Sequence, residues 1–376
     1  MESQTSLRDP GPAREAGHFR VAYQVLEEAI AVQAFPGCAF GVLAGGEVVL
    51  QGALGRFTYE ENSPAVTAQT VYDVASVTKV AATTAAAMLL HQRGEIDLES
   101  PVGELLPGFV VGRAPGDWAR HVTLRHLLAH NSGLPGYVEF FRNATTPASL
   151  FRACLQLPLQ AEPDKKAEYS DPGFILLGKA LTVARRELLT EWLRREVYVP
   201  LEMRSTGFCP ARALRSLIPP TEEDTWFRHR RVQGEVQDEN ASVLKGIAGH
   251  AGLFSNVPDL LRFAAAILRA ETDGESALAT LTLFQRKTVE LFAERQLPNG
   301  SSRALGWDTP SENSSAGRHF SQHSIGHLGY SGCSLWIDLD ACVAVVLLTN
   351  RTWPDRKSQL IKTVRPDFHN AIREAL

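Results

Sequence analysis

The chain opens with the apolar spacing of an amphipathic helix and then changes to the spacing of strands. In His18–Gln33, apolar residues recur with helical periodicity, which predicts a helix with one buried face. Gly37–Ala44 and Glu47–Gln51 are apolar or alternating, and Gly45-Gly46 joins them with a sequence typical of a hairpin turn. The pattern therefore predicts a helix followed by an antiparallel strand pair.

The middle of the chain has a helical pattern, and the end returns to strands. A long apolar run begins at Ser76 and predicts a helix that ends at Gly94, a residue type common just past a helix. From Ile96 to about Thr280, helical segments alternate with irregular loops that prolines punctuate. Further predicted elements are helices at Thr123–His130, Gly173–Val183 and Pro258–Ala270, strands at Ser324–Ser331, Ser334–Leu339 and Cys342–Thr349, and a last helix at Pro366–Leu376.

This order of elements predicts an α+β fold in which both ends of the chain build one antiparallel sheet. We expect residues 18–95 to join residues 285–376 in an α/β lobe with helices flanking the sheet. Residues 96–284 are expected to form a mostly helical lobe, with an active site between the two lobes. Residues 1–17 are polar and rich in proline and glycine, which predicts a loose segment.

Composition excludes some classes of function and changes little else. The apolar fraction of 44% and the charged fraction of 21% are those of a soluble globular protein. A net charge of −4 gives no basic surface for nucleic acid or anionic lipid. No run reaches the roughly 18 apolar residues of a membrane span, and the first residues lack the apolar core of a signal peptide. Five scattered cysteines without a CxxC pair indicate free thiols, so we expect a cytoplasmic protein.

Ser76-Val-Thr-Lys79 is the first motif with a chemical meaning. Residues three apart share one face of a helix, so the Lys79 amine lies where it could take the Ser76 hydroxyl proton. The alternative is structural: Ser76 caps a helix and Lys79 extends to solvent. A second match, Ser242-Val-Leu-Lys245, is interpreted as chance because no long apolar helix follows it.

Two later motifs follow Ser76-Val-Thr-Lys79 in a specific order, Tyr169-Ser-Asp171 and then Gly326-His-Leu-Gly-Tyr-Ser-Gly332. With these motifs the chain, from about Tyr23 to its end, resembles the β-lactamase-like serine hydrolases. That family includes class C β-lactamases, penicillin-binding proteins, D-peptidases and carboxylesterases with a β-lactamase fold. Looser supporting stretches are Leu127–Pro135, Gly249–Ser255 and Leu305–Asp308.

The resemblance implies a role for each motif residue. Ser76 would be the nucleophile, and Lys79 its base or proton relay. Tyr169 would pass a proton to the leaving group from across the cleft. The backbone N–H of Tyr330 would join that of Ser76 in an oxyanion hole, and Gly329 would let the strand approach the substrate closely.

Two residues depart from the β-lactamase pattern. Asp171 stands where β-lactamases have asparagine, and a carboxylate cannot donate a hydrogen bond to a substrate carbonyl. We expect Asp171 to orient Lys79 and to favour its protonated form, leaving more of the proton transfer to Tyr169. His327 stands where lysine is typical, and a histidine that is mostly neutral near pH 7.5 attracts an anion less.

These features predict a serine hydrolase that cleaves an ester or amide through an acyl-enzyme on Ser76, most simply a carboxylesterase. One alternative is a β-lactamase or D-amino-acid-specific peptidase with the same mechanism, and another is a non-catalytic scaffold or binding protein. The predicted partner is a small ester, amide or lactam, with no nucleic acid and no membrane span. No metal or cofactor is expected, because His126 and His130 lack the glutamate of an HExxH motif and suggest a structural role.

Pocket shape is expected to come from the irregular loops Tyr137–Ala144 and Pro219–Arg231. Trp226, Phe227 and Trp307 are candidates to line the pocket, although aromatic residues are more often part of the core. His250 is expected in a loop near the cleft, and no chemistry is assigned to it.

Overall fold

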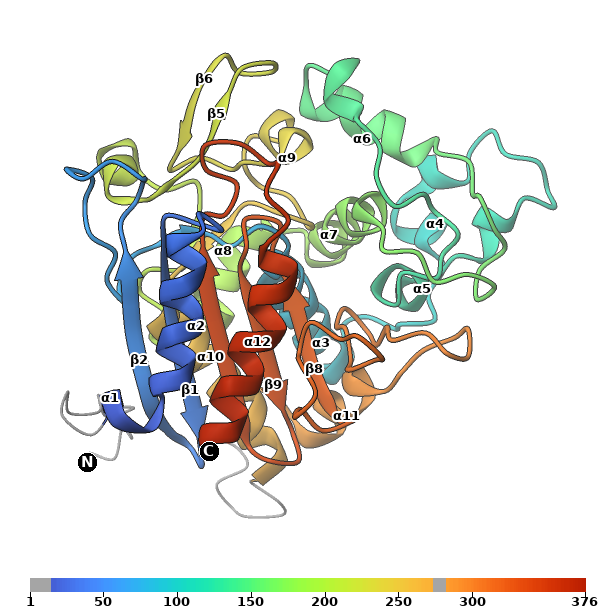
Figure 1. The fold of residues 1–376 in the computed structure, drawn as a ribbon. Coiled ribbons are helices and arrows are strands. Elements are labelled where there is room, and N and C mark those ends of the chain that lie inside the picture. The colour runs from blue at the N-terminus through green and yellow to red at the C-terminus, as the bar shows by residue number, and fades with distance from the viewer. Residues whose placement is uncertain (1–14, 273–281) are drawn as a thin grey trace.

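The computed structural model describes residues 15–272 and 282–376 (Figure 1). Most of the loose segment predicted for residues 1–17 therefore lies outside the described residues. The strands are β1 (Gly37–Ala44), β2 (Glu47–Gly55), β3 (Tyr72–Asp73), β4 (Gly207–Phe208), β5 (Pro220–Asp224), β6 (Arg230–Gln233), β7 (Leu253–Ser255), β8 (Ser324–Leu328), β9 (Ser334–Asp338) and β10 (Val343–Thr349).

The α-helices are α1 (Glu15–His18), α2 (Arg20–Ala31), α3 (Ala85–Gln92), α4 (Val102–Leu105), α5 (Leu124–Leu128), α6 (Pro147–Leu155), α7 (Asp171–Arg185), α8 (Leu189–Leu193), α9 (Glu239–Val243), α10 (Val257–Thr272), α11 (Arg286–Ala293) and α12 (Ile361–Ala375). Short 3-10 or π segments are η1 (Ala75–Val77), η2 (Lys79–Thr84), η3 (Pro107–Phe109), η4 (Trp118–His121), η5 (Phe140–Arg142), η6 (Arg194–Tyr198) and η7 (Arg212–Leu217).

The main sheet joins the two ends of the chain, as predicted. Its strand order is β2-β1-β10-β9-β8, and every neighbouring pair is antiparallel. Figure 1 shows the N-terminal strands in blue beside the C-terminal strands in red. The predicted α+β fold class is confirmed, because hairpins from the two ends pair through β1 and β10.

Helices cover both faces of this sheet. Alternate residues of β1 point to opposite sides, so Phe40 packs toward α2 and α12 while Ala39 joins the larger core on the other face. The ring of Phe40 lies 5.7 Å from that of Phe368 in α12, edge to face. In Figure 1, α2 and α12 lie side by side on the near face. On the far face α10 packs against β1 and β10, so this part of the middle segment belongs beside the sheet, and the lobe boundaries at 96 and 284 stay a prediction.

Several elements differ from the sequence prediction in their bounds or their type. The helix predicted from Ser76 consists of η1, η2 and α3 in succession. The final helix begins at Ile361, and Pro366 lies inside it. A proline lacks the N–H that would bond the carbonyl four residues earlier, but that residue is the exposed Lys362, so water can satisfy its carbonyl. The middle segment also contains short strands that its helical pattern did not reveal. These are β4 and β7, which form a small sheet with β3 from the earlier part of the chain, and the pair β5 and β6.

Glycines bring α7 into close contact with the loop that follows α9. A Cβ on Gly249 would lie 2.1 Å from the Phe174 carbonyl oxygen, and one on Gly178 would lie 2.9 Å from the Cα of Gly249. Real Cβ atoms do not tolerate such distances, so the two segments can pack only because neither residue has a side chain.

We expect Gly249→Ala to destabilise the protein, because the new methyl group forces α7 and the loop apart. Overpacking of this kind costs roughly 1–3 kcal/mol, which corresponds to a fall of a few degrees in Tm by thermal unfolding. The matched control is Gly207→Ala, where a Cβ meets no atom within 4 Å. Equal Tm values for the two variants would contradict the close-contact explanation.

Candidate active site

A strained turn presents Ser76 at the start of a helix. Strand β3 ends at Asp73, and Ala75 then adopts φ +47°, a left-handed conformation that is uncommon for alanine. The carboxylate of Asp73 accepts hydrogen bonds from the N–H groups of Ala75 at 2.9 Å and Gln237 at 2.8 Å. Burial raises the pKa of Asp73 to about 6, although these two hydrogen bonds lower it. The turn is therefore fixed by a buried carboxyl, and such strain is typical of functional sites.

Lys79 lies one turn after Ser76 and is fully buried. Its Nζ donates to Ser76 Oγ at 3.1 Å, to Asp171 Oδ1 at 2.6 Å and to the carbonyl oxygen of His250 at 3.1 Å. Burial lowers the pKa of Lys79, but Asp171 and Tyr169 together raise it more, so the net pKa is above its ordinary value. An ammonium has three N–H donors, and all three have acceptors here.

Helix α7 positions the second motif. Ser170 is its N-cap, accepting from the Gly173 N–H at 3.1 Å, and Asp171 is its first residue. The positive end of the helix favours a carboxylate in the first turn, and Asp171 forms its ion pair with Lys79 there. The structure places Asp171 beside Lys79, and its orienting role stays a prediction.

The ring of Tyr169 covers the lysine. The Nζ of Lys79 lies 4.7 Å from the centre of that ring. Burial raises the pKa of the Tyr169 phenol, while the Lys79 ammonium opposes the rise. The phenol is therefore neutral near pH 7, when it can both donate and accept a proton.

His327 lies on β8, the edge strand of the main sheet, and faces Tyr169 with ring centres 5.8 Å apart. Its Nδ1 donates to the carbonyl oxygen of Leu328 at 2.8 Å, which leaves Nε2 with a lone pair. Nε2 is buried and has no hydrogen-bond partner among the described residues. Burial lowers the pKa of His327 well below its ordinary value, and the charges of Lys79 and Arg303 add to this. The side chain is thus a neutral acceptor.

Gly329 and Tyr330 lie beyond the end of β8, in a turn, and not in the strand predicted to reach Ser331. The N–H of Gly329 donates to Cys333, and that of Gly332 donates back to Gly329, which closes the turn without using the Tyr330 N–H. A Cβ on Gly329 would lie 2.5 Å from the Val74 carbonyl oxygen. The glycine therefore lets the turn approach the chain just before Ser76.

One pocket contains all of the residues named for the site except the buried Lys79. Its volume is about 1030 Å³, and its lining includes Ser76, Tyr169, Asp171, His327, Gly329 and Tyr330. The exposed rings of Tyr137, Trp226 and Tyr330 also line it, so both loops expected to shape the pocket contribute to it.

Two of the three aromatic candidates for the pocket lie elsewhere. Trp307 is wrong as a pocket residue, because it is fully buried in the core and stacks on Phe263 at 6.4 Å between ring centres. Phe227 packs edge-on against Phe141 at 5.2 Å. Trp226 alone lines the pocket, and its neighbour Phe227 anchors the same loop.

Among the described residues, four arginines line the pocket, and three are bonded to protein oxygens. Arg351 donates to backbone carbonyls, including that of Tyr330 at 2.8 Å. Arg356 pairs with the carboxylates of Glu222 and Glu239. Arg365 donates to three carbonyls of the turn after β8.

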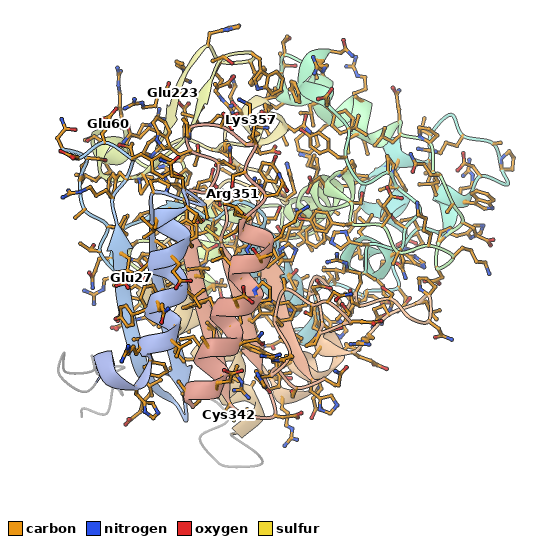
Figure 2. All side chains as sticks on the ribbon, in the orientation of Figure 1. Glu27, Glu60, Glu223, Cys342, Arg351 and Lys357 are labelled. Carbon is orange, nitrogen blue, oxygen red and sulfur yellow. The ribbon has the colours of Figure 1, made fainter. Side chains whose placement is uncertain are left out.

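In Figure 2, Arg351 lies at one end of β10, and Cys342 lies at the other.

Arg303 is the fourth arginine, and sequence reasoning missed it. Its guanidinium carbon lies 5.3 Å from the centre of the Tyr169 ring. Its ion pair with Asp308 is long, at 3.6 Å, and that carboxylate oxygen already accepts from Ser302 at 2.7 Å. Arg303 thus brings a cation to Tyr169, and much of its hydrogen-bonding capacity is unused among the described residues.

His250 also contributes to the site, although no chemistry was assigned to it. Its backbone carbonyl accepts from Lys79, and its Nε2 pairs with Asp238 Oδ1 at 2.9 Å. Burial alone would raise the pKa of Asp238, but the charge of His250 and other hydrogen bonds bring it down to about 2. The only sequence signal was the Gly249-His-Ala-Gly252 stretch, because a backbone carbonyl leaves no mark in a sequence.

Other candidates take no part in this pocket. Ser242 and Lys245 of the second Ser-x-x-Lys match are not among its lining residues. His126 accepts from the Thr123 N–H and contacts Asp164, which is a capping role. The described residues contain no cluster of three His, Cys, Asp or Glu side chains placed for a metal ion. No helix in residues 15–272 or 282–376 combines the length and apolarity needed to cross a bilayer.

Comparison with known proteins covers almost the whole chain. The Beta-lactamase family model matches residues 23–365. An N-acetylmuramyl-L-alanine amidase of Bacillus subtilis is 30% identical over 364 residues, which cover 87% of this chain and 80% of the relative. A putative D-alanyl-D-alanine carboxypeptidase of Salmonella gallinarum is 28% identical over 352 residues, covering 84% and 79%.

Solved structures share the fold. A penicillin-binding protein homologue from Caulobacter crescentus has a TM-score of 0.73 at 16% identity, covering 96% of this chain and 98% of its own. EstCE1, described as a hydrolase with promiscuous acyltransferase activity, has a TM-score of 0.70 at 20% identity, covering 94% and 99%. At these identities the likeness supports the fold alone.

We expect His327 to remain neutral throughout the pH range 6–8, as its depressed pKa requires. In ¹⁵N-histidine NMR spectra, assigned with His327→Gln, its signals should show the Nδ1–H tautomer and no titration in that range. Histidines of the urea-unfolded protein should titrate near 6.5 and serve as the control. Because the folded pKa is the lower one, His327 stabilises the fold above about pH 6.5 and loses this effect at lower pH. A titration midpoint near 6.5 in the folded protein would contradict this assignment.

Proposed function

This chain belongs to the Beta-lactamase family of serine hydrolases, and we propose that it cleaves an ester or amide through an acyl-enzyme on Ser76. The observation that carries the proposal is the contact of Ser76 Oγ with the Nζ of the buried Lys79, at 3.1 Å. Both belong to a site that opens into a pocket of about 1030 Å³. A purely structural helix start would not need a buried ammonium beside an accessible hydroxyl.

Lys79 acts in this proposal as an electrostatic partner and relay. Its raised pKa makes it an ammonium that donates to Ser76 Oγ, so it has no free lone pair to remove the Ser76 proton. A neutral Tyr169 can accept that proton on its oxygen while giving its own to the leaving group. The proton then moves from serine to leaving group without a phenolate, and the Lys79 charge stabilises the anionic character that develops on Ser76.

Ser76 Oγ attacks the substrate carbonyl carbon, and the carbonyl oxygen becomes an oxyanion. The N–H of Ser76, at a helix start, and the N–H of Tyr330 are the proposed donors to that oxyanion. The C–O or C–N bond then breaks, and the leaving group departs with the proton. A water molecule attacks the acyl-enzyme, its proton returning by the same relay, which releases the acid and restores the Ser76 hydroxyl.

Esters of uncharged acyl groups are the substrates we favour. Asp171 is committed to Lys79 at 2.6 Å and cannot serve as an amide donor. His327 is neutral and offers only a lone pair, so it lacks the charge that would draw a lactam carboxylate. Alkoxide and phenoxide leaving groups also need less protonation than an amine does.

A second candidate is a carboxypeptidase or amidase of the same mechanism, and Arg303 favours it. Its guanidinium lies over Tyr169, the proposed donor to the leaving group, and could bind a carboxylate carried by that group. The relatives named as an amidase and as a putative D-alanyl-D-alanine carboxypeptidase support this reading.

Ser76→Ala should lower kcat by several orders of magnitude. It should not unfold the protein, because the change deletes only one oxygen atom at the pocket surface. A fluorophosphonate probe should label the unaltered enzyme, and peptide mass spectrometry should place the adduct on Ser76. Ser242→Ala is the matched control and should keep full activity and labelling. An adduct on Ser242, or a folded protein that no acylating agent labels, would contradict the proposal, and the second result would support a binding role.

Short p-nitrophenyl esters should be hydrolysed with a higher kcat/KM than a chromogenic cephalosporin near neutral pH. The double variant His327→Lys with Asp171→Asn introduces the ammonium and the amide that are typical of β-lactamases at these positions. It should shift the ratio of the two kcat/KM values about tenfold toward the lactam, which is the effect of one charge-assisted hydrogen bond. His323→Lys, at an exposed histidine outside the pocket lining, is the control. Faster cleavage of the lactam or of a D-alanyl-D-alanine peptide by the unaltered enzyme would rule out the ester preference.

A further inference from the structure

We infer that His130 is a positioning residue for Tyr169, fixing the phenol for the proton relay between Ser76 and the leaving group. The inference rests on the proposed function, because it concerns a step of that reaction. His130 lies in the Leu127–Pro135 stretch that the sequence singled out, and it does not line the pocket. It makes three contacts at or next to Tyr169.

The first two contacts hold the backbone on either side of the tyrosine. The carbonyl oxygen of His130 accepts from the Glu168 N–H at 2.8 Å. Its Nδ1 accepts from the Ser170 N–H at 2.9 Å. One residue therefore bonds the N–H groups of both sequence neighbours of Tyr169, which restrains the backbone on either side of the tyrosine.

The third contact is with the ring of the tyrosine itself. The imidazole of His130 lies 4.7 Å from the Tyr169 ring, tilted by 41°, and 4.9 Å from the Phe174 ring, tilted by 30°. The Lys79 Nζ lies 5.6 Å from that same Phe174 ring. The side chains of His130, Tyr169, Phe174 and Lys79 pack together, and His130 restricts the orientations of the Tyr169 ring.

The chemistry of His130 argues against a role in stability alone. Its backbone has φ +58°, which strains any residue with a side chain, although histidine occurs there more often than most. Because Nδ1 accepts a hydrogen bond, the proton is on Nε2, and Nε2 is buried with no acceptor among the described residues. An unpaired buried N–H costs free energy that a hydrophobic residue would avoid. The position therefore requires the Nδ1 acceptor and the flat ring together.

His130 acts as a neutral side chain. Burial lowers its pKa well below the ordinary value, and the charges of Arg303 and Lys79 lower it further. It therefore supplies a hydrogen-bond acceptor and a packing surface, and no proton of its own.

Two variants separate the contributions of the ring and the acceptor. His130→Phe keeps a ring of similar shape and removes the Nδ1 acceptor. His130→Asn keeps an acceptor near the Nδ1 position and tolerates a positive φ, so it should fold even if the phenylalanine variant does not. His126→Gln is the matched control, because His126 lies in α5, four residues before His130, and its side chain bonds only Thr123 and Asp164 among the described residues.

The readout is the dependence on leaving group. We compare kcat/KM for two esters with the same acyl group. The leaving group of p-nitrophenyl butyrate needs little protonation, whereas that of methyl butyrate needs much. His130→Phe should lose at least tenfold more activity on the methyl ester than on the p-nitrophenyl ester. His130→Asn should recover part of that loss, and His126→Gln should change both esters by less than about twofold, even if its Tm falls.

A double-mutant cycle completes the test. In the Tyr169→Phe background, adding His130→Asn should cost little, because the relay that it positions is already absent. Equal losses on both esters, or losses of free energy that add fully in the double variant, would overturn the inference. These outcomes leave the proposed function intact if Ser76 is still labelled. Absence of a Ser76 adduct would instead overturn the proposed function, so the two failures are distinguishable.

Discussion

The ion pair between Lys79 and Asp171 is the interaction on which the rest of the site depends. An ammonium with no exposed side-chain surface is stable only if a carboxylate and further acceptors replace the water it has lost. The acceptors come from three distant parts of the chain: Ser76 one turn before, Asp171 at the start of α7, and the carbonyl of His250. The fold must therefore bring α7 and the loop that follows α9 against the helical segment that begins near Ser76. The close contact of Gly249 with Phe174 makes this possible.

This ion pair also limits the chemistry that the other groups can perform. Since Asp171 keeps Lys79 protonated, the lysine contributes charge and direction but no lone pair. Burial keeps Tyr169 neutral, so the phenol can carry a proton only by passing one on at the same time. Such a relay depends on geometry more than on basicity, because both hydrogen bonds of the phenol must be aligned at once. If this proposed relay operates, a rigid support for Tyr169 is as necessary as the nucleophile.

The sequence predicted the features that local pattern and motif order determine. The hairpin at Gly45-Gly46, the helix end at Gly94 and the contact of Ser76 with Lys79 all follow from spacing of a few residues. Long-range features were less accessible. The end of β8 at Leu328 depends on a turn closed by Cys333, and the position of Trp307 depends on packing against α10.

Some members of the site could not have been found from residue types at all. His250 contributes a backbone carbonyl, which every residue has, so its identity gave no signal. Arginine is common on protein surfaces, so the sequence does not single out Arg303. Its weak ion pair with Asp308 distinguishes it from Arg351 and Arg356, which are bonded to protein oxygens. Positions of this kind emerge only when the bonding of each side chain is known.

The charges around Tyr169 connect the two departures from the β-lactamase pattern with the choice of substrate. His327 faces the tyrosine as a neutral acceptor, so the edge strand presents a lone pair where a cation is usual for that family. A cation still lies near the tyrosine, but Arg303 supplies it from another loop, 5.3 Å from the centre of the ring. A substrate carboxylate would therefore have to approach from the Arg303 side, while His327 Nε2 requires a hydrogen-bond donor. In the proposed mechanism, substrate selectivity would therefore depend on the leaving group, because both residues lie beside the phenol that would protonate it.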